Sequence, residues 1–275
     1  MSENNTLPTE ENPATRSRIG GSFLRALAAL VLVLIIGAVF NADGAFFKVD
    51  THRDMLRAVS VCGILACGMT VVIISGGIDL SVGSVLGFTA VLFSLLSLHH
   101  GMSPALAIPV TIVAGTICGL LSGGLIARWS IQPFIATLAM MVFCRGAAKW
   151  ISGGQKISTV IQQTDGSFTN VPLPAIFDVI NARIFSGNAT TVSLIFIACI
   201  LLSWIVLSRL RWGRYLHAIG GNEEAARLSG VPVSAMKLLA YGLCGAFAAV
   251  AGICQAAQEL QGDPEAGASY ELTAI

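Results

Sequence analysis

The chain has 275 residues, of which 55% are hydrophobic and 11% are charged, with a mean hydropathy of +0.78 and a formal net charge of +1. Soluble globular proteins carry about 25% charged residues, so this composition excludes a soluble globule and predicts an integral membrane protein. The nearly balanced charge, with no basic face, gives no support to a nucleic-acid partner.

The chain begins with a polar segment, and the predicted helices follow it. Residues 1–22 are polar and contain Pro and Asn, which predicts a disordered tail. Seven apolar runs of about 20 residues follow, each long enough to cross a bilayer. They lie at about 23–42, 55–76, 80–99, 104–127, 131–151, 190–208 and 236–257. The runs lack the alternation of barrel strands, so the predicted fold class is all-α, a polytopic transmembrane helical bundle of about seven spans over residues 23–275.

Lys and Arg in short loops predict the orientation of the chain. The densest cluster is "RLRWGR", with Arg209, Arg211 and Arg214 between the sixth and seventh runs. Placing this cluster in the cytoplasm also places the N-terminal tail there. We therefore expect a multi-pass protein of a bacterial inner membrane with a cytoplasmic N-terminus and a cytoplasmic loop at about 209–235.

A carboxylate and two adjacent glycines interrupt the apolar sequence between the second and third runs. The stretch "VVIISGGIDLSVGSVLGF" contains Gly76, Gly77, Asp79 and Ser81 with almost no polar linker. Asp79 or Ser81 is a candidate N-cap for a helix that starts near Leu80. Two interpretations stay open: a capped hairpin at the membrane surface, or a broken helix that lines a polar pathway.

The loop from Arg211 to Lys237 contains a predicted two-turn helix. Asn222 is the expected N-cap, acidic residues complement the dipole of the first turn, and Gly230 with Pro232 ends the helix. The residues of interest are Asn222, Glu223, Glu224, Ala225, Ala226, Arg227, Leu228 and Gly230. Such a short helix needs a packing surface, which is either its own protein or a partner subunit.

Arg145 and Lys149 lie four residues apart near the end of the fifth run, hence on one helix face. They either extend to the lipid headgroups or line a polar pathway. The seven cysteines form no CxxC pair and have no histidine at zinc-ligand spacing, so no metal site is expected. No Walker A, HExxH or GxSxG motif occurs, and we expect neither an ATPase site nor a bound cofactor.

Four stretches in this order resemble one family. They are "ISGGIDLSVGSVLGF", "PFIATLAMMVFCRG", "AIGGNEEAARLSGVPV" and "GASYELTAI". The chain resembles, over about residues 55–275, the membrane permease subunits of ribose-type bacterial ATP-binding-cassette sugar importers, a branch that includes ribose, xylose, arabinose, galactoside and autoinducer permeases. Those permeases continue past "YELTAI" with further spans, so the resemblance implies that the permease domain is incomplete at its C-terminus.

The resemblance implies three protein partners, in addition to the lipid bilayer that surrounds the chain. These are a cytoplasmic ATPase subunit that binds the ATP, a periplasmic sugar-binding protein, and a second permease subunit in a homodimer or heterodimer. It also implies that the loop at 220–230 contacts the ATPase and that Arg145 matches the family's Arg-Gly pair. The alternatives are an ion-coupled secondary transporter that uses Asp79, and a membrane-embedded enzyme, for which no nucleophile and base constellation is visible.

Overall fold

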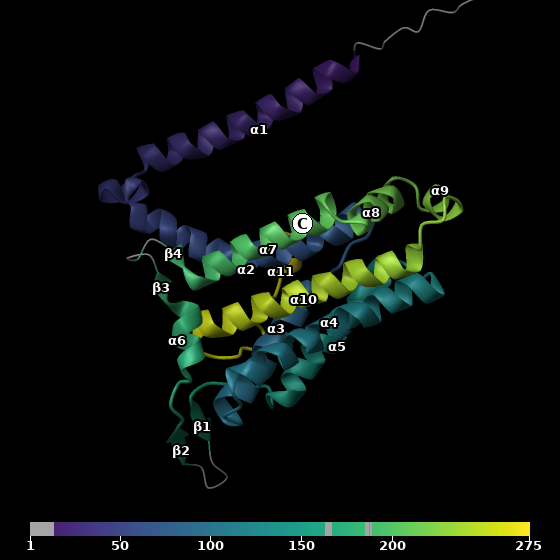
Figure 1. The fold of residues 1–275 in the computed structure, drawn as a ribbon. Helices are drawn as coiled ribbons and strands as arrows, with labels where there is room; N and C mark the ends of the chain where they lie inside the picture. Colours follow the sequence, from purple (N-terminus) through teal and green to yellow (C-terminus); the bar gives the residue numbers. More distant parts are fainter. Residues whose placement is uncertain (1–13, 163–166, 185–186, 188) are drawn as a thin grey trace, which may run out of the picture. The chain divides into compact units, whose positions relative to one another are not determined.

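The computed structural model (Figure 1) describes residues 14–162, 167–184, 187 and 189–275, so residues 1–13 of the predicted tail lie outside the described residues. The chain divides into two units after Asp54. The first contains α1 (Ala14–Val39) and the 3-10 helix η1 (Ala42–Phe47). Helix α1 starts before the expected residue 23 because no proline after Pro13 interrupts it.

Six helices in the described part of the chain are long and apolar enough to cross a membrane. They are α2 (Val49–Ile74), α3 (Val82–Ser94) with its π-helical continuation η2 (Leu95–His99), α4 (Pro104–Trp129), α5 (Pro133–Ile151), α7 (Thr191–Ser208) and α10 (Val233–Glu259). The apolar part of α1, Phe23–Val39, is a shorter helix. The predicted bundle of about seven spans is confirmed, because each apolar run corresponds to one of these helices.

Helix α10 is the centre of the second unit, where it packs against α4 and α3. Small residues bring α10 and α4 into close contact. A Cβ atom on Gly119 of α4 would lie 2.1 Å from the backbone oxygen of Tyr241, and one on Gly245 of α10 would lie 2.2 Å from that of Gly115. Glycines four residues apart are typical of close helix pairs in membranes, where packing replaces the hydrophobic effect as the driving force.

Short elements lie at the two ends of this bundle (Figure 1). At one end are α6 (Ala175–Asn181) and two hairpins, in which β1 (Val160–Gln162) pairs with β2 (Phe168–Asn170) and β3 (Arg183–Ile184) with β4 (Ala189–Thr190), both antiparallel. At the other end are α8 (Arg211–Gly221) and α9 (Glu223–Leu228). The last element, α11 (Tyr270–Thr273), contacts α3.

Candidate functional site

A break in the helical backbone separates α2 from α3, where the double glycine stands. Gly76 adopts a φ of 80°, a conformation that favours glycine. The hydroxyl of Tyr241, on α10, donates a hydrogen bond of 3.3 Å to the carbonyl oxygen of Ile78. A Cβ atom on Gly77 would lie 2.5 Å from that hydroxyl. The break is therefore held against the central helix, and the second glycine makes room for the contact.

Asp79 lies inside the protein, with only 1% of its surface exposed. Its Oδ1 accepts hydrogen bonds from the backbone N–H of Ser81, at 2.9 Å, and from the hydroxyl of Ser81, at 2.6 Å. The expected N-cap is only partly correct. The helix begins at Val82 rather than near Leu80, Ser81 occupies the N-cap position, and the Ser81 side chain makes no capping bond. Asp79 instead fixes the turn before the helix, because its short side chain reaches the amide two residues on.

A second break follows α10, in the segment 260–269. Leu260 ends the helix in the left-handed region, with a φ of 56°. The Nη1 atom of Arg145, on α5, then donates to the carbonyl oxygens of Pro264, at 2.6 Å, and Ala266, at 2.9 Å. Arg145 therefore fixes the path of this segment across the bundle.

Two ion pairs hold the same segment. Lys149 contacts Glu265 at 2.6 Å, and Lys156 contacts Asp263 at 2.9 Å. The hydrogen bond from Lys149 lowers the pKa of Glu265 below its ordinary value. Of the two interpretations of Arg145, the bonds of its guanidinium to backbone carbonyls of its own chain favour a place beside the polar pathway over one at the headgroups.

The two breaks meet at the start of α3. A Cβ atom on Gly83 would lie 2.2 Å from the carbonyl oxygen of Gly267, so the two backbones touch. Helices α3 and α11 thus both begin at this contact, each after a non-helical segment. Non-helical backbone at membrane depth is tolerated where protein surrounds it or where it lines a polar cavity.

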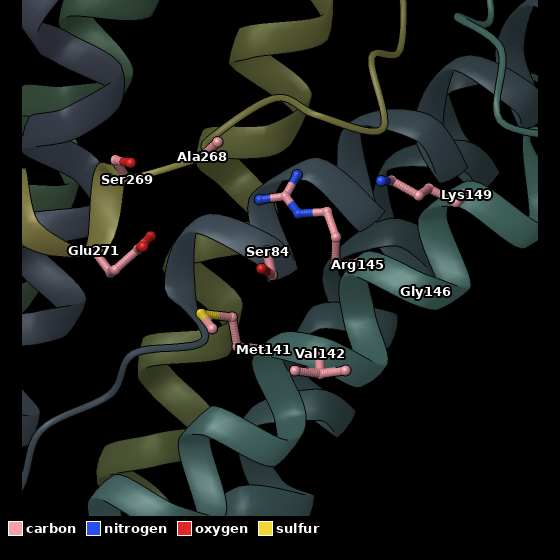
Figure 2. Close-up of a pocket in the computed structure, with 9 residues that line it drawn as sticks. All are labelled: Ser84, Met141, Val142, Arg145, Gly146, Lys149, Ala268, Ser269 and Glu271. Carbon is pink, nitrogen blue, oxygen red and sulfur yellow. The ribbon is translucent and has the colours of Figure 1, made fainter.

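A cavity of about 420 Å³ lies beside this contact. Its lining combines charged, hydroxyl and apolar side chains, and consists of Ser84, Met141, Val142, Arg145, Gly146, Lys149, Ala268, Ser269 and Glu271. In Figure 2 the guanidinium of Arg145 lies above Ser84 and the carboxylate of Glu271 lies to its left, with Met141 and Val142 below them. This volume falls within the range of roughly 300–1,000 Å³ that is usual for small-molecule sites.

The structure separates the residues that we predicted for the translocation pathway. Arg145 lines the cavity, whereas Gly76, Gly77, Asp79 and Ser81 do not. These four residues belong to the first break, where they shape the backbone. Lys149, which the sequence analysis paired with Arg145, lines the cavity too, but sequence reasoning missed Ser84, Ser269 and Glu271. Ser84 stands shortly after the first break, and Ser269 stands at the end of the second. Their positions beside the glycine-containing breaks are the sequence feature that could have identified them.

At the opposite end of the bundle, the predicted two-turn helix is confirmed as α9. The Oδ1 atom of Asn222 accepts a hydrogen bond of 2.9 Å from the N–H of Ala225, which is the expected cap. Gly230 follows the helix with a φ of 84°, as expected of a C-terminal stop. The helix α8, which precedes it, was not predicted, because we interpreted its cluster of arginines as a loop.

Glu223 connects α9 to the N-terminal part of α10. Its carboxylate contacts Lys237 at 2.7 Å and Arg227 at 3.0 Å. The hydrogen bond from Lys237 is the main reason why the pKa of Glu223 is lowered. Glu223 and Lys237 also line a polar cavity of about 290 Å³, together with residues 130–133 between α4 and α5.

The two faces of α9 differ in exposure. Ala226 is 5% exposed and packs into the core of its own chain. Of the two packing surfaces that the sequence left open for this helix, the face of α9 that carries Ala226 therefore uses its own protein, and a partner cannot enclose Ala226 there. Leu228 is 82% exposed, and Ala225, Glu224 and Arg227 are exposed as well. The surface that α9 offers to a partner centres on Leu228.

Known proteins match nearly the whole chain. Residues 53–275 match the family described as branched-chain amino acid transport system, permease component. The chain is 35% identical to the ribose import permease of Escherichia coli K12 over 90% of its own length and 73% of that protein. It is also 35% identical to the Haemophilus influenzae ribose import permease, over 96% and 79%, and 34% identical to the Rhizobium meliloti fructose import permease, over 82% and 61%. No solved structure matches the chain.

The fold and the two regions described above define a multi-pass helical membrane protein with an open cavity that charged, hydroxyl and apolar side chains line. The chain belongs to the family of permease components of transport systems, and the relatives that it matches include ribose, fructose, xylose and autoinducer-2 permeases.

Proposed function

We propose that the chain forms the membrane pathway for a ribose-like monosaccharide in an ATP-binding-cassette importer. One observation carries the proposal: the match to ribose import permeases extends over at least 90% of the chain at 35% identity. The cavity beside α3, α5 and the segment 260–269 supports it, because its lining includes Arg145 and Glu271, and a hydroxylated solute needs such polar groups in an otherwise apolar protein.

A separate ATPase subunit supplies the energy in this proposal. The sequence contains no phosphate-binding loop, so the chain acts as a transport subunit and not as the enzyme that hydrolyses ATP. Helix α9 is the proposed contact, since it is capped, is fixed to α10 through Glu223, and exposes Leu228 at the end of the bundle. The proposed orientation places this end and the N-terminus in the cytoplasm of a bacterial cell.

The opposite end, with its two hairpins and α6, then faces the periplasm, where a sugar-binding protein delivers the solute. A second permease subunit completes the pathway. The ion-coupled alternative has no comparable support. The buried Asp79 carboxylate accepts hydrogen bonds from the N–H and the hydroxyl of Ser81, and these bonds fix a turn.

The test is reconstitution of the complete importer in proteoliposomes with its ATPase and binding protein. We expect uptake of labelled D-ribose that requires ATP on the side of α9 and fails with an ATPase subunit that lacks its catalytic carboxylate. The control is the same assembly without the binding protein. Uptake driven by a proton or sodium gradient in the absence of ATP would instead support the secondary transporter.

A further inference from the structure

The cavity beside Gly83 has the chemistry of a binding site for a neutral polyol. The carboxylate of Glu271, the guanidinium of Arg145 and the hydroxyl of Ser84 line the same cavity, with the guanidinium above Ser84 and the carboxylate to its left in Figure 2. A carboxylate accepts hydrogen bonds from two neighbouring hydroxyl groups, and a guanidinium donates in a fixed plane. The apolar side chains of Met141 and Val142 can then contact the C–H face of a sugar ring.

The charges around the cavity balance, which selects against an ionic ligand. Lys149 is paired with Glu265 at 2.6 Å. This leaves the positive charge of Arg145 and the negative charge of Glu271 facing the cavity. A phosphate or carboxylate ligand would be attracted by Arg145 but repelled by Glu271. A neutral solute with several hydroxyl groups satisfies both.

Arg145 retains donors for such a solute. A guanidinium has five N–H donors, and the Nη1 atom of Arg145 uses its own for the carbonyls of Pro264 and Ala266. Within the described residues, these are the two hydrogen bonds that Arg145 makes. The carbonyls fix the guanidinium plane, so the Nη2 and Nε groups are held in place before a ligand arrives, and this preorganisation lowers the entropic cost of binding.

We propose that this cavity is the site in the membrane where the transported sugar binds, with Glu271 and Arg145 as its recognition residues. The proposal rests on the proposed transport function and adds the residues of the site and the requirement for adjacent hydroxyl groups. Glu271 binds the hydroxyl pair, Arg145 binds a ring or hydroxyl oxygen, and Ser84 lines the cavity beside them.

The structure offers a variant that fills the cavity without disturbing its walls. A Cβ atom on Gly146, which lines the cavity, meets no heavy atom within 4 Å. Gly146→Leu therefore places a side chain in the open space, and Leu is a better helix former than Gly. The matched control is Gly124→Leu on α4, where a Cβ atom meets only Leu238 at 3.9 Å and which lies outside this cavity.

The test compares sugar uptake with ATP hydrolysis in the reconstituted importer. Because a separate protein captures the sugar, the expected defect is in molecules of D-ribose moved per ATP hydrolysed. Glu271→Gln keeps the shape but weakens the charged hydrogen bonds, and we expect roughly a tenfold lower ratio. Gly146→Leu should lower the ratio at least as far, with ATP hydrolysis retained, while Gly124→Leu should match the wild type.

The outcomes distinguish the two proposals. If wild-type importer moves D-ribose but Glu271→Gln and Gly146→Leu both keep the wild-type ratio, the cavity is not the sugar site and the transport function stands. If the wild type moves none of D-ribose, D-xylose and D-fructose with ATP, the proposed function fails, and the sugar site fails with it. A lower ratio in the Gly124→Leu control would also refute the site, because the effect would not be specific to the cavity.

Discussion

Gly83 and Gly267 touch backbone to backbone: a Cβ atom on Gly83 would lie 2.2 Å from the carbonyl oxygen of Gly267, and one on Gly267 would lie 2.4 Å from that of Gly83. Neither neighbour is the end of a flexible side chain, so the contact cannot relax locally. We expect Gly83→Ala to destabilise the folded protein by about 1–3 kcal/mol, as overpacking does elsewhere. Thermal unfolding of the detergent-solubilised protein measures this as a lower Tm.

Gly124→Ala is the control for that substitution. Its Cβ atom would meet only a side-chain carbon of Leu238 at 3.9 Å, which is ordinary contact. Alanine also favours the helix by about 1 kcal/mol over glycine. The control should keep or raise the Tm. An unchanged Tm in Gly83→Ala would show that the two breaks do not meet at this point.

The hydroxyl of Tyr241 connects the central helix to the first break. It donates to the carbonyl oxygen of Ile78 at 3.3 Å, and Tyr241 itself is almost completely buried. Tyr241→Phe removes this donor and should cost about 1 kcal/mol. The measurement is the Tm, compared with Tyr215→Phe on α8, a half-buried tyrosine for which we expect a smaller change. Equal shifts in both variants would contradict a specific role for the Tyr241 hydroxyl.

Asp79 provides a test of whether a carboxylate or only an acceptor is needed. Asp79→Asn keeps an oxygen that can accept from the N–H of Ser81, so most of the folded yield and transport should remain. Asp79→Leu leaves that buried N–H unsatisfied, which costs about 1–3 kcal/mol. Purified yield and ATP-driven uptake check both variants. Loss of uptake in Asp79→Asn with a normal yield would show that the charge itself takes part in transport.

The spans could be predicted from the sequence because a bilayer imposes their length and polarity. The run expected at 190–208 became Thr191–Ser208, and that at 131–151 became Pro133–Ile151. The ends of single elements were less accurate. The helix expected near Leu80 starts at Val82, because Asp79 uses its oxygen to fix the preceding turn.

The cavity could not be predicted from the sequence. Glu271 and Arg145 belong to segments far apart in the chain, and a local pattern carries no information on which segments fold together. The signal for Arg145 was its charge in an apolar run. Nothing local indicated that the segment 260–269 turns back onto α5. Arg145 binds backbone carbonyls there, which every residue has, and the charges of Asp263 and Glu265 do not show which lysines they will pair with. Likewise, the pattern around Ala226 did not reveal which face of α9 its own chain covers.

Glu223 predicts a pH dependence of stability. Its pKa is lowered in the folded protein, chiefly by the hydrogen bond from Lys237. A carboxylate whose pKa is lowered by folding stabilises the protein fully at a pH above its pKa in the unfolded chain, which is about 4.3. This stabilisation is lost as the pH falls through the pKa that the group has in the folded protein. The Tm difference between wild type and Glu223→Gln should therefore be constant from neutral pH to about pH 5 and shrink below about pH 4.

Glu224→Gln is the matched control for this titration. Glu224 stands next in the chain, but its side chain is 71% exposed and its nearest cation, on Arg227, lies at 3.7 Å. Exposed pairs of this kind contribute little. The Glu224 variant should follow the wild type at every pH. A Tm difference for Glu223→Gln that persists undiminished at low pH would mean that the contact with Lys237 is not what stabilises this end of α10.

The last prediction concerns the surface by which α9 contacts the ATPase. Leu228 is 82% exposed, whereas Ala226, two residues before it, is 5% exposed. Leu228→Ser removes an apolar side chain that the isolated permease does not bury, so the Tm and the membrane abundance should stay at the wild-type level. If Leu228 fills a pocket on the ATPase, its loss should cost about 1.5–3 kcal/mol of association, roughly tenfold or more in affinity.

Ala226→Trp has the opposite expected signature. A large side chain at a buried position overpacks the core of the permease itself, so the Tm should fall before any partner is added. The measurement is the recovery of the ATPase subunit with the affinity-tagged permease, set beside the Tm of each variant. Normal ATPase recovery with Leu228→Ser would exclude Leu228 as a contact. A lower Tm for Leu228→Ser would show that Leu228 packs within the permease. Both faces of α9 would then be covered by the permease itself, and the surface that contacts the ATPase would have to lie elsewhere on the loop.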